Sequence, residues 1–375
     1  MNLQLFKPVY HIDECLSKIK ECMEIGWTGA GNFTDTFEKA WKDYTGFAHA
    51  HFLNSATAGL HLAVKIFKQE LNWEDGDEII SSPITFISDA HAISYENLHV
   101  TFADVDETLC LDLKSIKSKV TEKTRAIIFV GYGGNIGQYF DIVNFCRENK
   151  LIFIFDAAHC TGTRYNGKIV GTEADCAVYS YQAVKNLCCA DAGMICFKEE
   201  KFDVIARKMA WLGISKNTHQ RTNAEGAYKW KYDVEYFGNK YHGNSIMAAI
   251  LLVQLKYVDQ DNAYRRQIVQ WYNDNLKSKI RHIPTTPGCE SSCHLYVIEI
   301  DNRDEVLLAL NQVGIFPGVH YISNTRYKMY AYAEGTCSNA EMMDNRILSL
   351  PLHLQLSKAD IDFISENVMR FSNAE

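Results

Sequence analysis

Amphipathic and wholly apolar segments alternate along the first two hundred residues. The segment DTFEKAWKDYTG is amphipathic, with a start signal at Asp35, where Glu38 follows three residues later, and a stop signal at Gly46. Its apolar side chains recur at helical spacing: Phe37, Ala40, Trp41 and Tyr44. This pattern predicts a helix that begins at Asp35, ends before Gly46 and buries one face.

The apolar segments are short and continuous, as in strands that are buried on both faces. They are AHFLN (50–54), DEIISSP (77–83), HVTFADV (99–105), RAIIFVG (125–131), LIFIFD (151–156), CAVYSY (176–181) and MICF (194–197). Helical segments such as TAGLHLAVKIFKQEL separate them. This alternation predicts an α/β fold in which helices cover both faces of a largely parallel sheet.

The last third of the chain has a different pattern. A long helix is predicted over about residues 245–276, and HLYVIEI, DEVLLALNQVG and KADIDFISENVMRF predict a smaller α/β unit after it. We therefore expect a large domain with an N-terminal arm over residues 1–245. Residues 246–375 would form the long connecting helix and a smaller C-terminal domain.

Composition excludes several classes of protein. A net charge of -8 and a pI of about 5.9 argue against binding to nucleic acid or to anionic membranes. The longest apolar run, near residues 246–253, is too short to span a bilayer, and the opening segment MNLQLFKPVYHIDE lacks the features of a secretory leader. We therefore expect a cytoplasmic protein. The twelve cysteines contain no C-x-x-C, which predicts reduced thiols and no metal site.

Asp156 ends an apolar run, and burying an unpaired carboxylate is costly, so this side chain should meet a cation. One interpretation is a dinucleotide-binding unit, because the glycine-rich GYGGNIG follows a predicted strand and Asp156 lies about twenty residues beyond it. The glycine spacing counts against this interpretation. Ile136 stands where the third glycine of G-x-G-x-x-G should be.

The other interpretation is a pyridoxal-phosphate site. LNSATAGL places small and hydroxyl residues between a strand and a helix N-terminus, where free N–H groups and the helix dipole bind phosphate. Phe86 is an aromatic side chain that could stack on a flat ring. Lys185 follows Ser180 in nearly uncharged surroundings, where a lysine can lose its proton and form a Schiff base. Asp156 would then pair with the protonated ring nitrogen of the cofactor.

Several long segments, in order along nearly the whole chain, resemble the fold type I family of nucleotide-sugar aminotransferases known as the DegT or StrS family. They include GWTGAGNFTDTFEKAWKDYTG, LNSATAGLHLAV, FDAAHCTGTRYNGKIVGTEADCAVYSYQAVKNL, GNKYHGNSIMAAILLVQL and GIFPGVHYI. The resemblance implies a large domain with a mostly parallel seven-stranded sheet sandwiched by helices. It also implies a smaller C-terminal α/β domain.

The resemblance implies pyridoxal 5′-phosphate as the cofactor and names its contacts. Lys185 would carry the cofactor as a Schiff base, Asp156 would bind the ring nitrogen, and His159 would contact the ring face or its phenolic oxygen. These three are the implied catalytic residues. The phosphate would be held by Thr57, by the N–H group of Ala56 and by Ser180.

The resemblance also implies a partner and a substrate. Asn239 would reach the phosphate of the neighbouring subunit's cofactor, so the active unit would be a homodimer. Phe86 and His320 would lie near the cofactor and the sugar. Lys240 stands where related enzymes acting on 3-keto sugars tend to carry an arginine, and it offers a compact charge for a phosphate or hydroxyl of the substrate.

The predicted function is a pyridoxal-phosphate-dependent aminotransferase that converts a nucleotide-linked keto-sugar, a 4-keto-6-deoxy sugar, to the amino-sugar with glutamate as donor. Alternatives are a 3-keto nucleotide sugar or another small keto substrate, and a pyridoxal-phosphate-binding regulator without turnover. A dehydratase of the same family would lack a lysine at position 185. Two departures from the family pattern, Gln182 and Asp191, leave the roles of these residues open.

Overall fold

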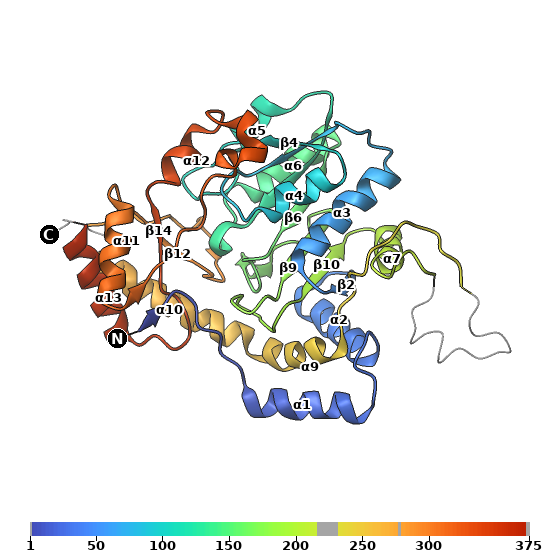
Figure 1. Ribbon diagram of the computed structural model, residues 1–375, viewed down its shortest axis with the longest axis horizontal. Helices are drawn as coiled ribbons and strands as arrows, with labels where there is room; N and C mark the ends of the chain where they lie inside the picture. The colour runs from blue at the N-terminus through green and yellow to red at the C-terminus, as the bar shows by residue number, and fades with distance from the viewer. Residues whose placement is uncertain (1, 216–231, 277–278, 373–375) are drawn as a thin grey trace.

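The computed structural model describes residues 2–215, 232–276 and 279–372, which fold around a seven-stranded sheet (Figure 1). The strands are β2 (His49–Leu53), β3 (Glu78–Ser81), β4 (His99–Phe102), β5 (Thr124–Val130), β6 (Ile152–Asp156), β9 (Cys176–Ser180) and β10 (Gly193–Phe197). Their order is β2-β10-β9-β6-β5-β3-β4, and among these seven β10 alone runs in the direction opposite to the other six. The predicted α/β fold with a mostly parallel seven-stranded sheet is confirmed.

The helices that concern the site and its support have the following bounds. They are α1 (Ile12–Glu24), α2 (Asn32–Thr45), α3 (Ala56–Glu70), α4 (Ser88–Tyr95), α5 (Leu113–Lys119), α6 (Tyr139–Asn149), α7 (Glu200–Met209), α9 (Ser245–Gln254), α10 (Val258–Leu276), α11 (Arg303–Gln312), α12 (Ser338–Met343) and α13 (Lys358–Phe371).

Helices flank both faces of the sheet, as predicted. On one face the Trp41 ring of α2 packs edge-on against Tyr179, with the ring centroids 4.8 Å apart. On the other face α3 lies so close to β9 that a Cβ added at Gly59 would be 2.7 Å from Val178 Cγ1. Because Val178 and Tyr179 are adjacent on one strand, their side chains point to opposite faces.

Helix α2 begins three residues before the predicted start at Asp35. The side chain of Thr34 makes the N-terminal cap: its hydroxyl donates to the Gly31 carbonyl (2.7 Å) and accepts from the Gly31 N–H (2.9 Å). Asp35 therefore lies inside the first turn. The predicted end is correct, because Gly46 adopts a left-handed φ of 84° that closes the helix.

The C-terminal part of the chain has its own apolar cluster, between α10, α11, α13 and the antiparallel pair of β12 (Tyr296–Glu299) and β14 (Ile347–Leu350). The predicted long helix over 245–276 consists of α9, a short 3-10 turn (Leu255–Tyr257) and α10. The N-terminal strand β1 (Leu3–Gln4) pairs with β13 (Ile315–Phe316) in this region. The domain boundary at residues 245 and 246 stays a prediction.

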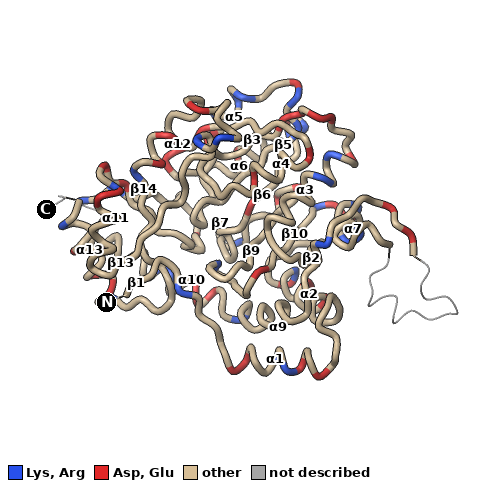
Figure 2. The backbone as a smooth tube through the Cα atoms, in the orientation of Figure 1, with Lys and Arg blue, Asp and Glu red and all other residues tan. Residues whose placement is uncertain are grey.

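Positions of basic and acidic residues are interspersed along the outer helices and loops (Figure 2). In the described part of the chain, no helix has the length and apolar character required to cross a membrane.

The strand directions bring several chain ends to one edge of the sheet. Asp156 ends β6 and Ser180 ends the parallel strand β9. Gly193, the first residue of the antiparallel strand β10, pairs both with Ser180 and with Leu53, the last residue of β2. The carboxyl ends of β2, β6 and β9 therefore meet, and this is the edge at which open α/β sheets bind ligands.

Candidate active site

A cavity of about 470 Å³ lies at this edge of the sheet. Most of the predicted site residues line it: Ala56, Thr57, Phe86, Asp156, His159, Ser180, Lys185 and His320. They come from the ends of β6 and β9, from the segments after β3, β6 and β9, from the start of α3 and from the C-terminal part of the chain. The sequence prediction for these eight residues therefore agrees with their placement, whereas their chemical roles stay predictions.

The N-terminus of α3 forms one end of the cavity. Ser55 caps the helix, because its hydroxyl accepts a hydrogen bond from the N–H of Ala58 at 3.1 Å. The N–H groups of Ala56 and Thr57, in the first turn, have no acceptor within the helix and carry its positive dipole end. Gly193 lies against this turn: an added Cβ would be 2.6 Å from Ala56 N. The close approach explains why a glycine begins β10.

Lys185 lies in the turn between β9 and β10. Its N–H donates to the Gln182 carbonyl at 2.8 Å, and the next side chain, Asn186, donates through Nδ2 to the Ser292 carbonyl at 2.6 Å. Burial lowers the pKa of Lys185 to about 8, although the nearby carboxylate of Asp156 opposes the shift. A larger fraction of the amine is therefore neutral and nucleophilic near neutral pH than for an ordinary lysine.

Asp156 is a buried carboxylate, only 4% exposed. Its Oδ1 accepts a hydrogen bond from the Ala158 N–H at 2.9 Å. Burial raises the pKa of Asp156, while the Ala158 N–H and the charge of Lys185 oppose the rise. In the part of the chain that the structure describes, Asp156 forms no ion pair with another side chain. The structure thus contains a buried carboxylate that lines a cavity and makes no direct ion pair with a described side chain.

His159 is held in one tautomer by its neighbours. The Gly133 N–H donates to Nδ1 at 3.2 Å, so the proton of the neutral ring resides on Nε2, which lies 3.2 Å from the Tyr321 hydroxyl. Burial, followed by the charge of Lys185, lowers the pKa of His159 well below its usual value. In this tautomer Nε2–H donates to the Tyr321 oxygen. The Tyr321 hydroxyl can then donate its own proton to a different acceptor.

Two further residues line the cavity, His320 from the C-terminal part of the chain and Phe86 from the segment between β3 and α4. His320 Nδ1 lies 2.9 Å from Ser349 Oγ, and burial, reinforced by the charge of Lys185, lowers the pKa of His320 to about 4. Phe86 is 60% exposed and its ring centroid lies 6.3 Å from that of Tyr321. The aromatic side chain of Phe86 therefore stands at the mouth of the cavity.

Two predicted residues, Asn239 and Lys240, do not line the cavity of their own chain. Asn239 Oδ1 accepts a hydrogen bond from Lys65 Nζ at 3.3 Å. Lys240 Nζ lies 3.5 Å from the centre of the Trp211 ring, in cation–π contact. Their predicted contacts are with a neighbouring subunit's site, so they stay predictions.

The dinucleotide interpretation does not survive the placement of the glycine-rich loop. A Cβ at Gly131 would lie 2.2 Å from Cys160 Sγ, and one at Gly134 would lie 2.3 Å from Ser292 Oγ. These glycines therefore allow close packing of the chain. The helix that follows, α6, begins at Tyr139, two residues after the last glycine of the loop, whereas the glycines of a dinucleotide-binding unit themselves open the helix.

Sequence reasoning missed two residues. Tyr321 lines the cavity and contacts His159, and its only sequence signal is its position directly after His320. Asp89 lies beside Asp156, and its signal was an acid soon after the strand in SSPITFISDA. An acid in the first turn of a helix is common because it interacts favourably with the helix dipole, so the sequence position of Asp89 does not indicate a further role.

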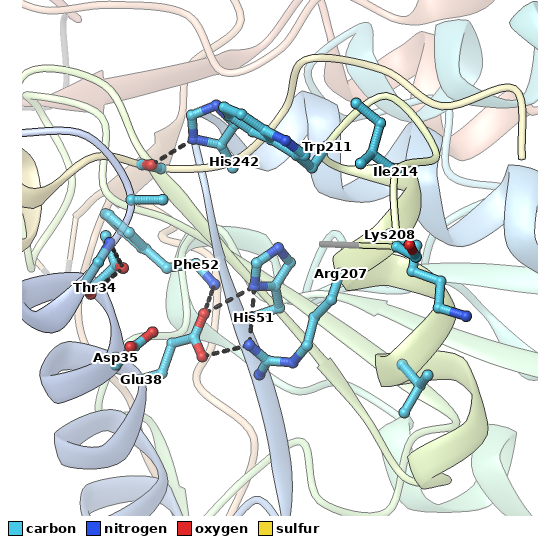
Figure 3. Close-up of a pocket in the computed structure, with 15 residues that line it drawn as sticks. Thr34, Asp35, Glu38, His51, Phe52, Arg207, Lys208, Trp211, Ile214 and His242 are labelled. Atoms are coloured by element: carbon cyan, nitrogen blue, oxygen red, sulfur yellow. Dashed lines mark hydrogen bonds and ion pairs between the residues drawn. The ribbon is translucent and has the colours of Figure 1, made fainter. Parts of the chain in front are cut away.

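A second cavity, of about 270 Å³, lies between α2, β2 and α7 (Figure 3). Its lining contains a buried ionic network centred on Glu38, which accepts from His51 Nδ1, the Phe52 N–H and Arg207 Nη1, each at 2.8 Å. Burial alone would raise the pKa of Glu38. The hydrogen bond from His51, the charges of His51 and Arg207 and the Phe52 N–H together lower that pKa to about 2. Because these charges satisfy one another, we assign the network to holding α2, β2 and α7 together.

The side chains that line the cavity around Lys185 have the chemistry needed to bind pyridoxal phosphate. The α3 N-terminus, with Thr57 and Ser180, offers donors to a phosphate. The buried Asp156 carboxylate suits a protonated ring nitrogen, and Lys185 supplies an amine of lowered pKa.

Comparison with known proteins agrees with this site. A family model described as the DegT/DnrJ/EryC1/StrS aminotransferase family matches residues 10–369. The spore coat polysaccharide biosynthesis protein SpsC of Bacillus subtilis is 32% identical over 373 residues, which cover 95% of this chain and 93% of SpsC.

Solved structures show the same fold. The aminotransferase TlmJ from Streptoalloteichus hindustanus is 27% identical and superposes with a TM-score of 0.91 over the whole of both chains. Spr1654 from Streptococcus pneumoniae, described as a sugar aminotransferase, is 26% identical, with a TM-score of 0.89 over 98% of each chain. Spr1654 has been solved in a PMP form and in a PLP form.

Family, fold and cavity therefore agree on one kind of enzyme. The predictions of an aminotransferase and of pyridoxal 5′-phosphate as its cofactor are confirmed. Because the family model spans almost the whole chain and the cavity retains the lysine and the carboxylate that the chemistry needs, this protein belongs to the DegT/DnrJ/EryC1/StrS aminotransferase family.

Proposed function

We propose that this protein transfers an amino group from glutamate to the keto group of a nucleotide-linked sugar. The observation that carries the proposal is the shared cavity of Lys185, Asp156 and the α3 N-terminus, which is also lined by His320 and Tyr321 from the C-terminal region. The family match and the sugar-related names of SpsC and Spr1654 support a sugar substrate.

The residues of the chain have separable tasks in this reaction. Pyridoxal phosphate, when bound, supplies an electron sink for the charge that develops at the donor's α-carbon. Thr57, Ser180 and the first-turn N–H groups of α3 hold its phosphate. Asp156 keeps a proton on its ring nitrogen. Lys185 Nζ removes the proton from the donor's α-carbon and, in the reverse step, delivers a proton to the sugar carbon that is aminated.

We further propose that the aminated position is carbon 4 of a 6-deoxy sugar. The support is the segment GNKYHGNSIMAAI, in which Lys240 stands where enzymes acting on 3-keto sugars tend to have an arginine. The purified enzyme, incubated with glutamate, is expected to aminate 4-keto-6-deoxy nucleotide sugars in preference to 3-keto-6-deoxy ones, as measured by mass spectrometry and NMR of the product. Exclusive turnover of the 3-keto compounds would reverse the assignment of the carbon. Failure of every keto-sugar, with glutamate still bound, would favour a regulator without turnover.

We also propose a homodimer with shared active sites. Asn239 follows a segment of exposed apolar side chains, of which Phe237 is 95% exposed and Val234 59% exposed. Such side chains are suited to contact with a second copy of the chain. By the family resemblance, Asn239 would complete the partner's site.

Mixing of two inactive variants tests this arrangement. Lys185→Ala and Asn239→Ala dimers are each expected to be nearly inactive. After subunit exchange, a mixed dimer has one site with Lys185 from one chain and Asn239 from the other, so about a quarter of wild-type activity should return from random pairing. Native mass spectrometry would verify the mixed dimers. Mixed dimers without recovered activity would contradict the shared site.

A further inference from the structure

Asp89 is a buried acid that the roles described above do not use. It lies in the first turn of α4 and is 0% exposed. Its Oδ2 accepts a hydrogen bond from Thr85 Oγ1 at 2.9 Å, whereas its buried Oδ1 receives no hydrogen bond from the described part of the chain. By contrast, Asp141 in the first turn of α6 is exposed to solvent, as is usual for such acids.

A second buried acid, Asp156, lies beside Asp89. The carboxyl groups of Asp89 and Asp156 are in hydrogen-bonding contact. Two buried carboxylates in contact cannot both be charged, so the pair holds one proton.

The neighbours decide which carboxyl carries the proton. Asp156 receives the Ala158 N–H and lies near the amine of Lys185, and both favour its charged form. Asp89 receives only the Thr85 hydroxyl, and burial and the Asp156 charge raise its pKa well above the usual value. The proton therefore resides on Asp89. A protonated Oδ1 acts as a donor to Asp156, which explains why it receives no hydrogen bond itself.

We propose that Asp89 is a positioning residue of this enzyme: its neutral carboxyl donates a hydrogen bond to Asp156 and holds the Asp156 carboxylate in place for the ring nitrogen of the cofactor. The proposal rests on the cofactor role of Asp156 and deepens it. Asp89 does not line the cavity, so it acts through Asp156 and not on the substrate. With the Ala158 N–H it gives the Asp156 carboxylate two fixed donors, which restrain its rotation.

Two substitutions at Asp89 separate a hydrogen-bond role from a packing role. Asp89→Asn keeps a donor and an acceptor of the same shape, whereas Asp89→Leu keeps an apolar volume but removes the donor. The dissociation constant for pyridoxal phosphate alone, measured by titration with the apoprotein, is expected to rise about 10- to 100-fold in Asp89→Leu. In Asp89→Asn it should stay within about threefold of the wild-type value, since an amide also donates.

The pH dependence of this affinity gives a second readout. Without the donor, the pKa of Asp156 rises, so Asp156 becomes protonated at higher pH and the acid side of the affinity profile moves to higher pH in Asp89→Leu. Asp89→Asn should leave the profile nearly unchanged. The other titratable groups that face Asp156, namely Lys185, Cys160 and Tyr321, remain in every variant. The matched control is Asp141→Leu, which removes an exposed first-turn acid and should change neither quantity.

Infrared spectroscopy of the wild-type apoprotein tests the proton without any destabilising change. A band of a protonated carboxyl is expected at neutral pH and should disappear in Asp89→Asn. Absence of that band, or a cofactor affinity and pH profile in folded Asp89→Leu equal to wild type, would overturn the proposal. These measurements use the cofactor alone, so a wrong assignment of the sugar substrate would not affect them.

Discussion

Replacement of Lys185 by alanine is expected to abolish amino-group transfer, with a loss of roughly 10²–10⁴-fold or more in kcat. The variant lacks both the amine that attaches the cofactor and the base that moves the proton at the donor's α-carbon. Its phosphate and ring contacts at Thr57, Ser180 and Asp156 remain, so non-covalent binding of the cofactor should persist. Steady-state kinetics with glutamate and a keto-sugar measures the first effect, and equilibrium dialysis measures the second.

Two controls sharpen the Lys185 prediction. Lys185→Arg keeps a positive charge but cannot attach the cofactor, and Lys198→Ala removes an exposed lysine outside the cavity. Borohydride reduction and peptide mapping should find the cofactor on Lys185 in the wild type. Because burial lowers the pKa of Lys185 to about 8, covalent uptake by the apoprotein should accelerate as pH rises through that value, where the amine becomes neutral. Full activity in Lys185→Ala, or cofactor attached elsewhere, would refute the assignment.

Asp156→Asn is expected to slow amino-group transfer by roughly 10²-fold or more, since the ring nitrogen loses the charged partner that keeps it protonated. Cofactor affinity should fall about tenfold or more with the loss of a charge-assisted hydrogen bond. The near-isosteric amide should preserve the fold. Because burial penalises the ionised form and raises the pKa of Asp156, the apoprotein should keep or raise its thermal midpoint at neutral pH.

The prediction for Asp156→Asn is specific because it combines a large loss of activity with an unchanged or raised thermal midpoint of the apoprotein. The same change at the exposed Asp141 is the control and should alter neither kcat nor cofactor affinity. A wild-type rate in Asp156→Asn would mean that Asp156 has only a structural role. A large fall in its thermal midpoint would instead show that the carboxylate stabilises the apoprotein, contrary to the cost expected from its burial.

Much of the fold was visible in the sequence because burial leaves a local pattern. Each of the seven sheet strands coincides with a short apolar segment, and α3 starts within one residue of the predicted TAGLHLAVKIFKQEL. The site was predictable for a related reason. Asp156 and Lys185 are polar groups set in apolar surroundings, and such groups need a compensating partner, which points to a ligand.

The sequence by itself determined which apolar segments form the buried strands and helix faces, and that Asp156 and Lys185 within such surroundings require a partner. The tertiary structure alone decided the antiparallel direction of β10, the hydrogen bond between His159 and Tyr321, and the contact of Asp89 with Asp156. Apolar periodicity records the exposure of each residue but carries no information on strand direction or on neighbours from distant segments. Those neighbours are set by the order in which the strands and helices pack, so the protonation and orientation of Asp156 could not be deduced from its own segment.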